Sequence, residues 1–291
     1  MRRYYRPAGQ NSSPFPLIKS EHGVRPPVVA GIFYPENRMA LGETVEKFFS
    51  NRSSKPEKAI ALMVPHGRYQ SCGGVQGAVY SRIKWPATAV VISPSHTGMG
   101  KPVSIVHKGM WETPLGQIAI HQKLAERIRK SDLNLIQFDE KAHEEEHAIE
   151  VQVPFLQKSQ SIRSFVPVIV RECDETSSKT IGEAIAQAIR QNGEEVLLIG
   201  TTNLTRYEPR EIVMEKDKKL LDAILQLDEM KLWDAVKKME SSMCGAGATA
   251  VLMAAAKHLG TSRAVLVKYK VSGEETQDKL SVVGYAGVII Q

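Results

Sequence analysis

The sequence has few cysteines, and it has neither a secretory start nor a long hydrophobic run. Only three cysteines occur among 291 residues, Cys72, Cys173 and Cys244. They are far apart and odd in number, which argues against a disulfide framework and for a reducing compartment. The start of the chain is charged and has no apolar stretch, so it does not resemble a signal peptide. No run reaches the roughly 18 apolar residues of a membrane span. We therefore expect a cytoplasmic protein with no membrane partner.

The sequence also lacks a strong excess of charge of either sign. Lysine and arginine number 38 against 32 acidic residues, a net charge of +6. These charges are dispersed along the chain, whereas nucleic-acid-binding domains concentrate basic residues in patches, so we expect no nucleic-acid partner. Hydrophobic residues make up 42% of the chain, which is enough for a core and excludes general disorder.

The pattern along the chain predicts an N-terminal arm and one folded domain. Residues 1–24 are rich in proline, serine, asparagine and arginine without periodicity, which is typical of a surface arm. Residues 25–291 alternate short apolar runs with helical patterns and contain no obvious linker. The predicted strands span residues 59–64, 87–93, 164–170, 196–200, 264–271 and 281–290. The predicted helices span residues 39–50, 74–83, 122–130, 146–157, 175–191, 209–226, 231–239 and 245–259.

This alternation predicts an α/β fold with a mostly parallel or mixed central sheet sandwiched by helices. Continuous Val/Ile/Leu strands are typical of a sheet that is buried on both faces. In such sheets, ligands bind beyond the carboxyl ends of the strands. The residues that follow each apolar run are therefore the first candidates for a functional site.

Two histidines follow predicted strands, and one cysteine precedes a predicted helix. His66 comes shortly after the strand 59–64, and His96 after the strand 87–93. If these strands are neighbours, both imidazoles face one crevice, and imidazole is the commonest metal ligand. Cys244 lies at the start of an alanine-rich helix, where a thiol pKa falls and the thiolate can bind a metal. The alternatives are two unrelated loop histidines and a small buried cysteine.

His143 and His147 form an H-E-x-x-H pattern with Glu144 between them. Two histidines four residues apart on one helix can share a zinc ion, as in metalloproteases. However, the residues between them are all acidic, whereas zinc peptidases place apolar residues there. The alternatives are a surface junction between a loop and a helix, or a His147 that lines another pocket. A zinc peptidase site at His143 and His147 remains the remote alternative.

A polar segment follows the predicted strand 196–200. It contains Asn203 and Arg206, which could form hydrogen bonds with an anionic ligand. Ordinary turn chemistry is the alternative explanation for these residues.

Several blocks, in this order, make the chain resemble the Memo family, also called the AmmeMemoRadiSam system protein B family. The blocks cover roughly residues 25–290 and read RPPVVAGIFYP, PHGRY, SPSH, WETPLG, EHAIEVQVPFL, CG and VVGYAG. The resemblance implies the α/β fold of class III, LigB-type, extradiol dioxygenases. It also implies a metal site of two histidines and a cysteine, which match His66, His96 and Cys244. The implied metal is Fe(II), alternatively copper or zinc, or none, and the implied partner is a radical-SAM system protein.

The chain departs from the family pattern at two places. The family segment SSDLSHY appears here as TTNLTRY, so Asn203 replaces an aspartate of the pocket and Arg206 replaces a histidine. Arginine does not release its proton at working pH, which puts dioxygenase chemistry in doubt. The segment PHAGY appears as PHGRY, which adds Arg68 beside the first histidine. Both changes favour either the binding of an anion in the pocket or a loss of catalysis.

Two main functional hypotheses follow. In the first, the chain is a dioxygenase-like metal protein that carries out redox chemistry on a small polar substrate, with His147 and Arg206 as candidate catalytic residues. In the second, it is a non-catalytic binding or scaffold protein. That protein would recognise an acidic or phosphorylated peptide in the same pocket. In the first hypothesis Asn203 and Arg206 contact the substrate, and in the second Arg206 and Arg68 bind the acidic ligand.

Overall fold

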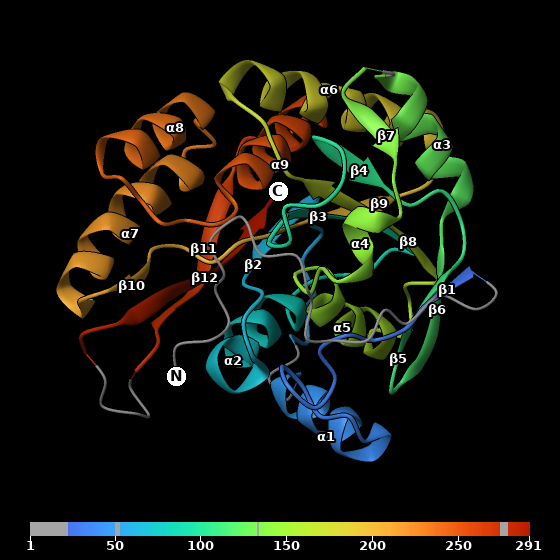
Figure 1. Ribbon diagram of the computed structural model, residues 1–291, viewed down its shortest axis with the longest axis horizontal. Coiled ribbons are helices and arrows are strands. Elements are labelled where there is room, and N and C mark those ends of the chain that lie inside the picture. Colours follow the sequence, from blue (N-terminus) through green and yellow to red (C-terminus); the bar gives the residue numbers. More distant parts are fainter. Residues whose placement is uncertain (1–22, 50–52, 133, 274–278) are drawn as a thin grey trace.

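The computed structural model describes residues 23–49, 53–132, 134–273 and 279–291 as one mixed sheet between layers of helices (Figure 1). This confirms the predicted α/β fold class. The path through the sheet is β1 (Val24–Arg25), β5 (Met110–Thr113), β6 (Gly116–Ile120), β8 (Ser164–Val170), β3 (Thr88–Pro94), β9 (Val196–Thr201), β2 (Ala61–Val64), β12 (Val282–Ile290) and β10 (Arg206–Glu208). Beside this path lie β4 (Val103–Ile105), β7 (Ile136–Phe138) and β11 (Ala264–Val271).

Four central strands, β8, β3, β9 and β2, are parallel neighbours. Their side chains are buried on both faces, which explains their nearly continuous apolar sequences. On one side of them β12 runs antiparallel to β2, so the sheet is mixed. Because the central strands are parallel, the residues that follow β2, β3 and β9 meet at one edge of the sheet.

The helices of the described residues cover both faces of the sheet. They are α1 (Arg38–Phe48), α2 (Tyr69–Tyr80), α3 (Gln122–Ser131), α4 (Lys141–Glu144), α5 (Val153–Lys158), α6 (Glu175–Asn192), α7 (Arg210–Leu225), α8 (Glu229–Lys238), α9 (Ala246–His258) and the 3-10 helix η2 (Glu150–Gln152). Helices α3, α6 and α9 share one core layer with Val90 and Ile92 of β3. Helices α1 and α5 share the other layer with Ala89 and Val91, so the alternation along β3 separates the two layers (Figure 1).

One predicted helix needs correction. The helix expected over residues 146–157 is a turn followed by η2 and α5, because the Glu146 and Glu150 carboxylates bind distant backbone groups. Residues 1–22 of the predicted arm lie outside the described residues, but Val24 pairs with Met110 in the sheet. The division into an arm and one domain otherwise stays a prediction. Within the described residues, no helix combines the length and the apolarity needed to cross a membrane.

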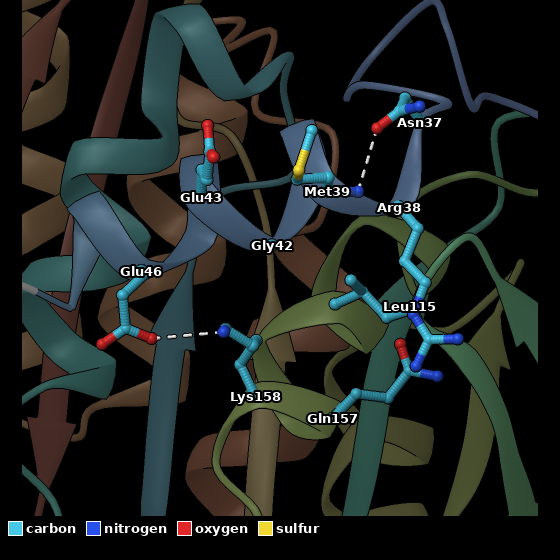
Figure 2. Close-up of a pocket in the computed structure, with 9 residues that line it drawn as sticks. All are labelled: Asn37, Arg38, Met39, Gly42, Glu43, Glu46, Leu115, Gln157 and Lys158. Atoms are coloured by element: carbon cyan, nitrogen blue, oxygen red, sulfur yellow. Dashed lines mark hydrogen bonds and ion pairs between the residues drawn. The ribbon is translucent and has the colours of Figure 1, made fainter.

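A hollow of about 760 Å³ lies between α1 and α5 (Figure 2). Its lining includes the exposed Met39, and an ion pair of 3.3 Å joins Glu46 Oε2 to Lys158 Nζ across it. None of the predicted site residues lines this hollow. The predicted site residues His66, His96 and Cys244 lie instead beyond the carboxyl ends of the central strands.

Candidate metal centre

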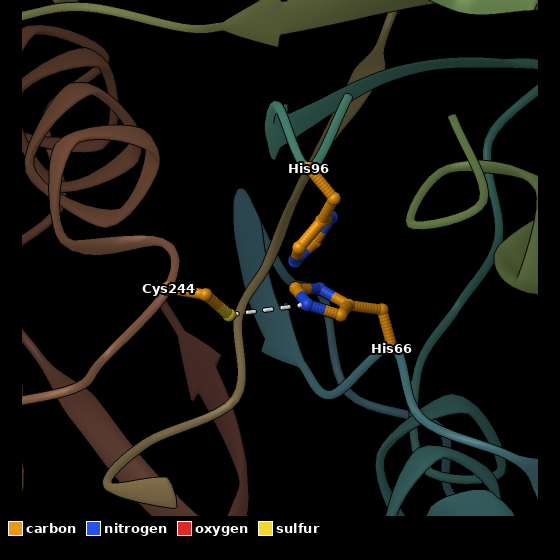
Figure 3. A group of neighbouring side chains, drawn as sticks. All are labelled: His66, His96 and Cys244. Carbon is orange, nitrogen blue, oxygen red and sulfur yellow. Dashed lines mark hydrogen bonds between the residues drawn. The ribbon is translucent and has the colours of Figure 1, made fainter. Parts of the chain in front are cut away.

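The structure brings His66, His96 and Cys244 together at one edge of the sheet (Figure 3). His66 follows β2, His96 follows β3, and Cys244 precedes α9. One donor atom from each residue lies within 4.8 Å of the other two. Cys244 Sγ is 3.2 Å from His66 Nε2, and the centroids of the two imidazole rings are 4.9 Å apart. Three side chains that are distant in the sequence thus converge as a group that could hold a metal ion.

His66 is completely buried, and its ring and backbone are held by hydrogen bonds. Its Nδ1 lies 2.9 Å from Thr201 Oγ1, and its backbone N–H donates to Asn203 Oδ1 at 3.1 Å. Gln152 Nε2 in turn donates to Thr201 Oγ1 at 3.2 Å. When Nδ1 carries the ring proton and donates to Thr201, the lone pair of Nε2 faces Cys244. This arrangement suits a metal-ligating imidazole.

His96 is held by the buried carboxylate of Glu146. This carboxylate accepts the His96 backbone N–H, lies 2.9 Å from His96 Nδ1 and accepts the Ala148 N–H at 2.9 Å. Burial lowers the pKa of His96, but the Glu146 carboxylate and the Cys244 sulfur outweigh it and raise the pKa to about 10. Burial alone would raise the pKa of Glu146, yet His96 holds it well below its usual range. Carboxylate–histidine pairs of this kind orient metal ligands in many proteins.

The sulfur of Cys244 accepts a hydrogen bond from the backbone N–H of Asn203 at 3.4 Å. Burial raises the pKa of this thiol, but the adjacent His66 and His96 outweigh burial and hold the pKa well below its usual range. The thiolate is the form that binds a metal. The thiols of Cys72 and Cys173 differ from that of Cys244 in the direction of their pKa shift, because burial raises the pKa of each to about 12.

His147 lies beside this group. Its ring centroid is 4.6 Å from that of His96 and 5.8 Å from that of His66. Its Nδ1 lies 3.4 Å from Glu146 Oε1, and together with His96 and Glu146 it forms a second group of potential ligands. Burial lowers the pKa of His147 to about 3, so the imidazole is neutral at physiological pH. A neutral imidazole beside a metal group can accept a proton from a ligand.

The structure contradicts the zinc peptidase hypothesis. Helix α4 ends at Glu144, so His143 and His147 do not share one helix. His143 is buried, and its Nε2 lies 3.2 Å from the carbonyl oxygen of Ser104. The H-E-x-x-H pattern therefore does not place its two histidines on one metal ion.

The predicted ligand-binding residues occupy different positions. Asn203 contacts both His66 and Cys244 and thereby positions two residues of the candidate metal group. Arg206 donates from Nε to the carbonyl oxygen of Ser242 at 2.9 Å, two residues before Cys244. Arg68 is exposed at the start of α2, with its guanidinium 5.7 Å from the ring centroid of Phe33. The roles of these residues toward a ligand stay predictions.

Sequence reasoning missed three residues that hold the ligands: Glu146, Thr201 and Gln152. Glu146 lies in an acidic run, which is usually a solvated surface. One feature could have distinguished it, since this glutamate directly precedes His147 and the apolar segment that starts at Ala148. Thr201 ends the buried strand β9 and carried no local pattern of its own.

Comparisons with known proteins find relatives over nearly the whole chain. A family model described as "Memo-like protein" matches residues 25–289. The chain is 34% identical over 274 residues to "MEMO1 family protein MTH_45" of Methanothermobacter thermautotrophicus, covering 90% of this chain and 99% of the relative. It is 35% identical to a "MEMO1 family protein" of Methanosarcina mazei, covering 92% and 99%. The crystal structure of the uncharacterized protein JW3007 from Escherichia coli K12 matches with a TM-score of 0.52 at 11% identity. That match covers 80% of this chain and 100% of the other, and it supports the fold alone.

Proposed function

The chain belongs to the Memo family, and on this premise we propose that it binds a metal ion through His66, His96 and Cys244. The observation that supports this proposal is the convergence of the three donor atoms within 4.8 Å. Each ligand is held by a partner of its own, His66 by Thr201, His96 by Glu146 and Cys244 by the Asn203 N–H.

The charges of the group favour a divalent cation. The Cys244 thiolate and the Glu146 carboxylate carry two negative charges around two imidazoles that are neutral when metal-bound. A divalent ion such as Fe(II), or alternatively Zn(II) or Cu(II), balances them. Metal binding replaces one proton of His96, so we expect binding to release a proton.

We place His147 as the residue that moves protons during redox chemistry on a small polar substrate. A metal ion held by His66, His96 and Cys244 would supply redox or Lewis-acid chemistry. The Nδ1 atom of His147 lies toward Glu146, so Nε2 is the atom that accepts a proton from the substrate. Because burial lowers the pKa of His147 to about 3, the imidazole has a free lone pair at physiological pH, but in this environment it is a weak base whose pKa must rise when substrate binds for efficient proton transfer.

A second function, non-catalytic recognition of an acidic or phosphorylated peptide, is favoured by the position of Arg68. Its exposed side chain lies over Phe33, whose ring centroid is 4.7 Å from that of His147. A guanidinium in this position can bind a carboxylate or a phosphate close to Phe33 and His147. The partner protein of a radical-SAM system remains a prediction.

Metal analysis of protein purified without an affinity tag tests the proposed site. We expect about one metal ion per wild-type chain, as for a single mononuclear site, and almost none in the variant His66→Ala/Cys244→Ala. The matched control is His258→Ala/Cys173→Ala, which removes a histidine and a cysteine away from the group and leaves the metal content unchanged. Equal metal content in the wild type and the His66→Ala/Cys244→Ala variant would contradict the metal site and leave the second function.

A further inference from the structure

A buried arginine in the first strand, Arg25, forms hydrogen bonds with the segment that carries Glu146 and His147. Arg25, in β1, is 9% exposed. Its Nε donates to the carbonyl oxygen of His143 at 2.6 Å, and its Nη2 donates to the carbonyl oxygen of Glu146 at 2.8 Å. The guanidinium carbon lies 4.1 Å from the ring centroid of Trp111. One planar group thus fixes two carbonyl groups three residues apart.

The third nitrogen of the guanidinium, Nη1, forms an ion pair with Glu150. Arg25 Nη1 donates to Glu150 Oε2 at 2.8 Å, in an ion pair whose acidic side chain is 1% exposed. The same carboxylate accepts the backbone N–H groups of Val28 and Val29 at 3.0 Å and the Tyr34 hydroxyl at 2.7 Å. Residues 24–34, the N-terminal strap, are therefore locked onto residues 143–150.

Resting on the proposed metal site, we propose that Arg25 is a positioning residue that fixes Glu146 and thereby holds His96 as a metal ligand. The path has two contacts, from Arg25 to the Glu146 carbonyl group and from the Glu146 carboxylate to His96. Since Glu146 is completely buried, its side chain follows its backbone. Releasing the 143–146 backbone therefore frees the carboxylate from His96.

A lysine at this position cannot form all the hydrogen bonds that the Arg25 guanidinium forms. Its ammonium is a compact point charge, whereas arginine presents donors in a rigid planar fork. Arg25→Lys therefore keeps the positive charge beside Glu150 but loses the simultaneous hold on both carbonyl groups. The variant separates the positioning of Glu146 from the neutralisation of Glu150.

Titration of metal-free protein with Co(II) alone tests the proposal, because a thiolate–cobalt absorption band reports the geometry of the ligands. We expect Arg25→Lys to weaken Co(II) binding about 10- to 100-fold, the usual effect of losing a group that orients a metal ligand. We also expect the band to shift. The control is Arg127→Met, which removes the contact of a half-buried arginine with Asn192 and leaves affinity and spectrum unchanged.

A double variant protects the test against simple unfolding. Arg25→Met/Glu150→Gln removes both buried charges together, so neither is left unpaired. We expect this variant to fold, as judged by circular dichroism, and to bind Co(II) as weakly as Arg25→Lys. If both variants bind Co(II) with wild-type affinity and spectrum, Arg25 has no positioning role.

A second measurement separates the failure of this proposal from the failure of the metal site. The measurement is a proton NMR spectrum of the metal-free protein. In wild type and in Arg127→Met, we expect a downfield resonance from the His96 Nδ1 proton, which is hydrogen-bonded to Glu146. Arg25→Lys should lose this resonance. If wild type binds no Co(II), the metal site is wrong, and the resonance alone decides the role of Arg25. Its persistence in Arg25→Lys would overturn the proposal.

Discussion

His143 is buried as a neutral imidazole and should make the protein sensitive to acid. Burial, with the nearby Arg25 charge, lowers its pKa to about 3, whereas an unfolded histidine has a pKa of about 6.5. Between these values the unfolded chain binds a proton that the folded protein excludes, so stability falls as the pH falls. Above about pH 6.5 His143 is neutral in both the folded and the unfolded chain, so it no longer makes stability depend on pH. We predict that His143 contributes a loss of up to about 1.4 kcal/mol per pH unit in this window.

Chemical denaturation at a series of pH values measures this contribution. In His143→Gln the side-chain amide can still donate to the Ser104 carbonyl group but takes up no proton. The free energy of unfolding should therefore depend less steeply on pH between about 6.5 and 3 than in wild type. Parallel curves for the two proteins across this range would contradict the prediction.

At the same scale, the sequence predicts which residues form the candidate metal group better than it predicts the residues that orient them. His66 and His96 are recognisable because a parallel sheet brings the ends of neighbouring strands together. Cys244 is recognisable because it precedes a helix. By contrast, the role of Glu146 depends on its burial against His96, which no local spacing reveals. Arg25 acts over a separation of 121 residues from Glu146, and only the tertiary structure places the two together.

At the scale of elements, the crossing of α6 and α9 depends on one glycine. A Cβ atom on Gly182 would lie 2.6 Å from Ala254 Cβ and 2.8 Å from the backbone nitrogen of Ala255. Gly182→Ala should therefore push α6 and α9 apart and lower the free energy of unfolding by about 1–3 kcal/mol, as overpacked cores do.

The matched control is Gly74→Ala in α2, where a Cβ atom would meet only Lys268 Nζ at 3.8 Å. This glycine is exposed, so alanine should raise the free energy of unfolding by about 1 kcal/mol through its higher helix propensity. Denaturation of the two variants beside wild type measures both changes. A stability of Gly182→Ala equal to that of Gly74→Ala would show that α6 and α9 can separate freely.

Long elements were predictable from the sequence, and short ones were not. The predicted strand 164–170 agrees with β8, and the predicted helix 175–191 agrees with α6 to within one residue. Their apolar patterns are long enough to distinguish a buried strand from an amphipathic helix. Strands β4, β7 and β10 have three residues each, which is too short for any periodicity. Their pairing depends on neighbouring strands that are distant in the sequence.

At the scale of the whole molecule, a bound metal would link the ends of two central strands to the start of α9. The contact between His66 and Cys244 spans 178 residues of the chain, and the unfolded chain has no preformed site to hold the ion. A ligand that binds only the folded state stabilises it by about 2.7 kcal/mol at a free concentration of 100 times its dissociation constant. We predict that Zn(II) raises the free energy of unfolding of wild type by this amount and that a chelator reverses the gain.

The variant Cys244→Ala carries the decisive comparison, because it lacks one ligand while the sheet and helices keep their packing. Zn(II) and chelator should change its unfolding free energy by much less than they change that of wild type. Cys173→Ala, which removes a thiol away from the group, should respond as wild type does. An equal response of Cys244→Ala and Cys173→Ala would mean that Zn(II) acts elsewhere on the folded chain. The loss of response in Cys244→Ala alone would locate the stabilising ion where the strand ends and α9 meet.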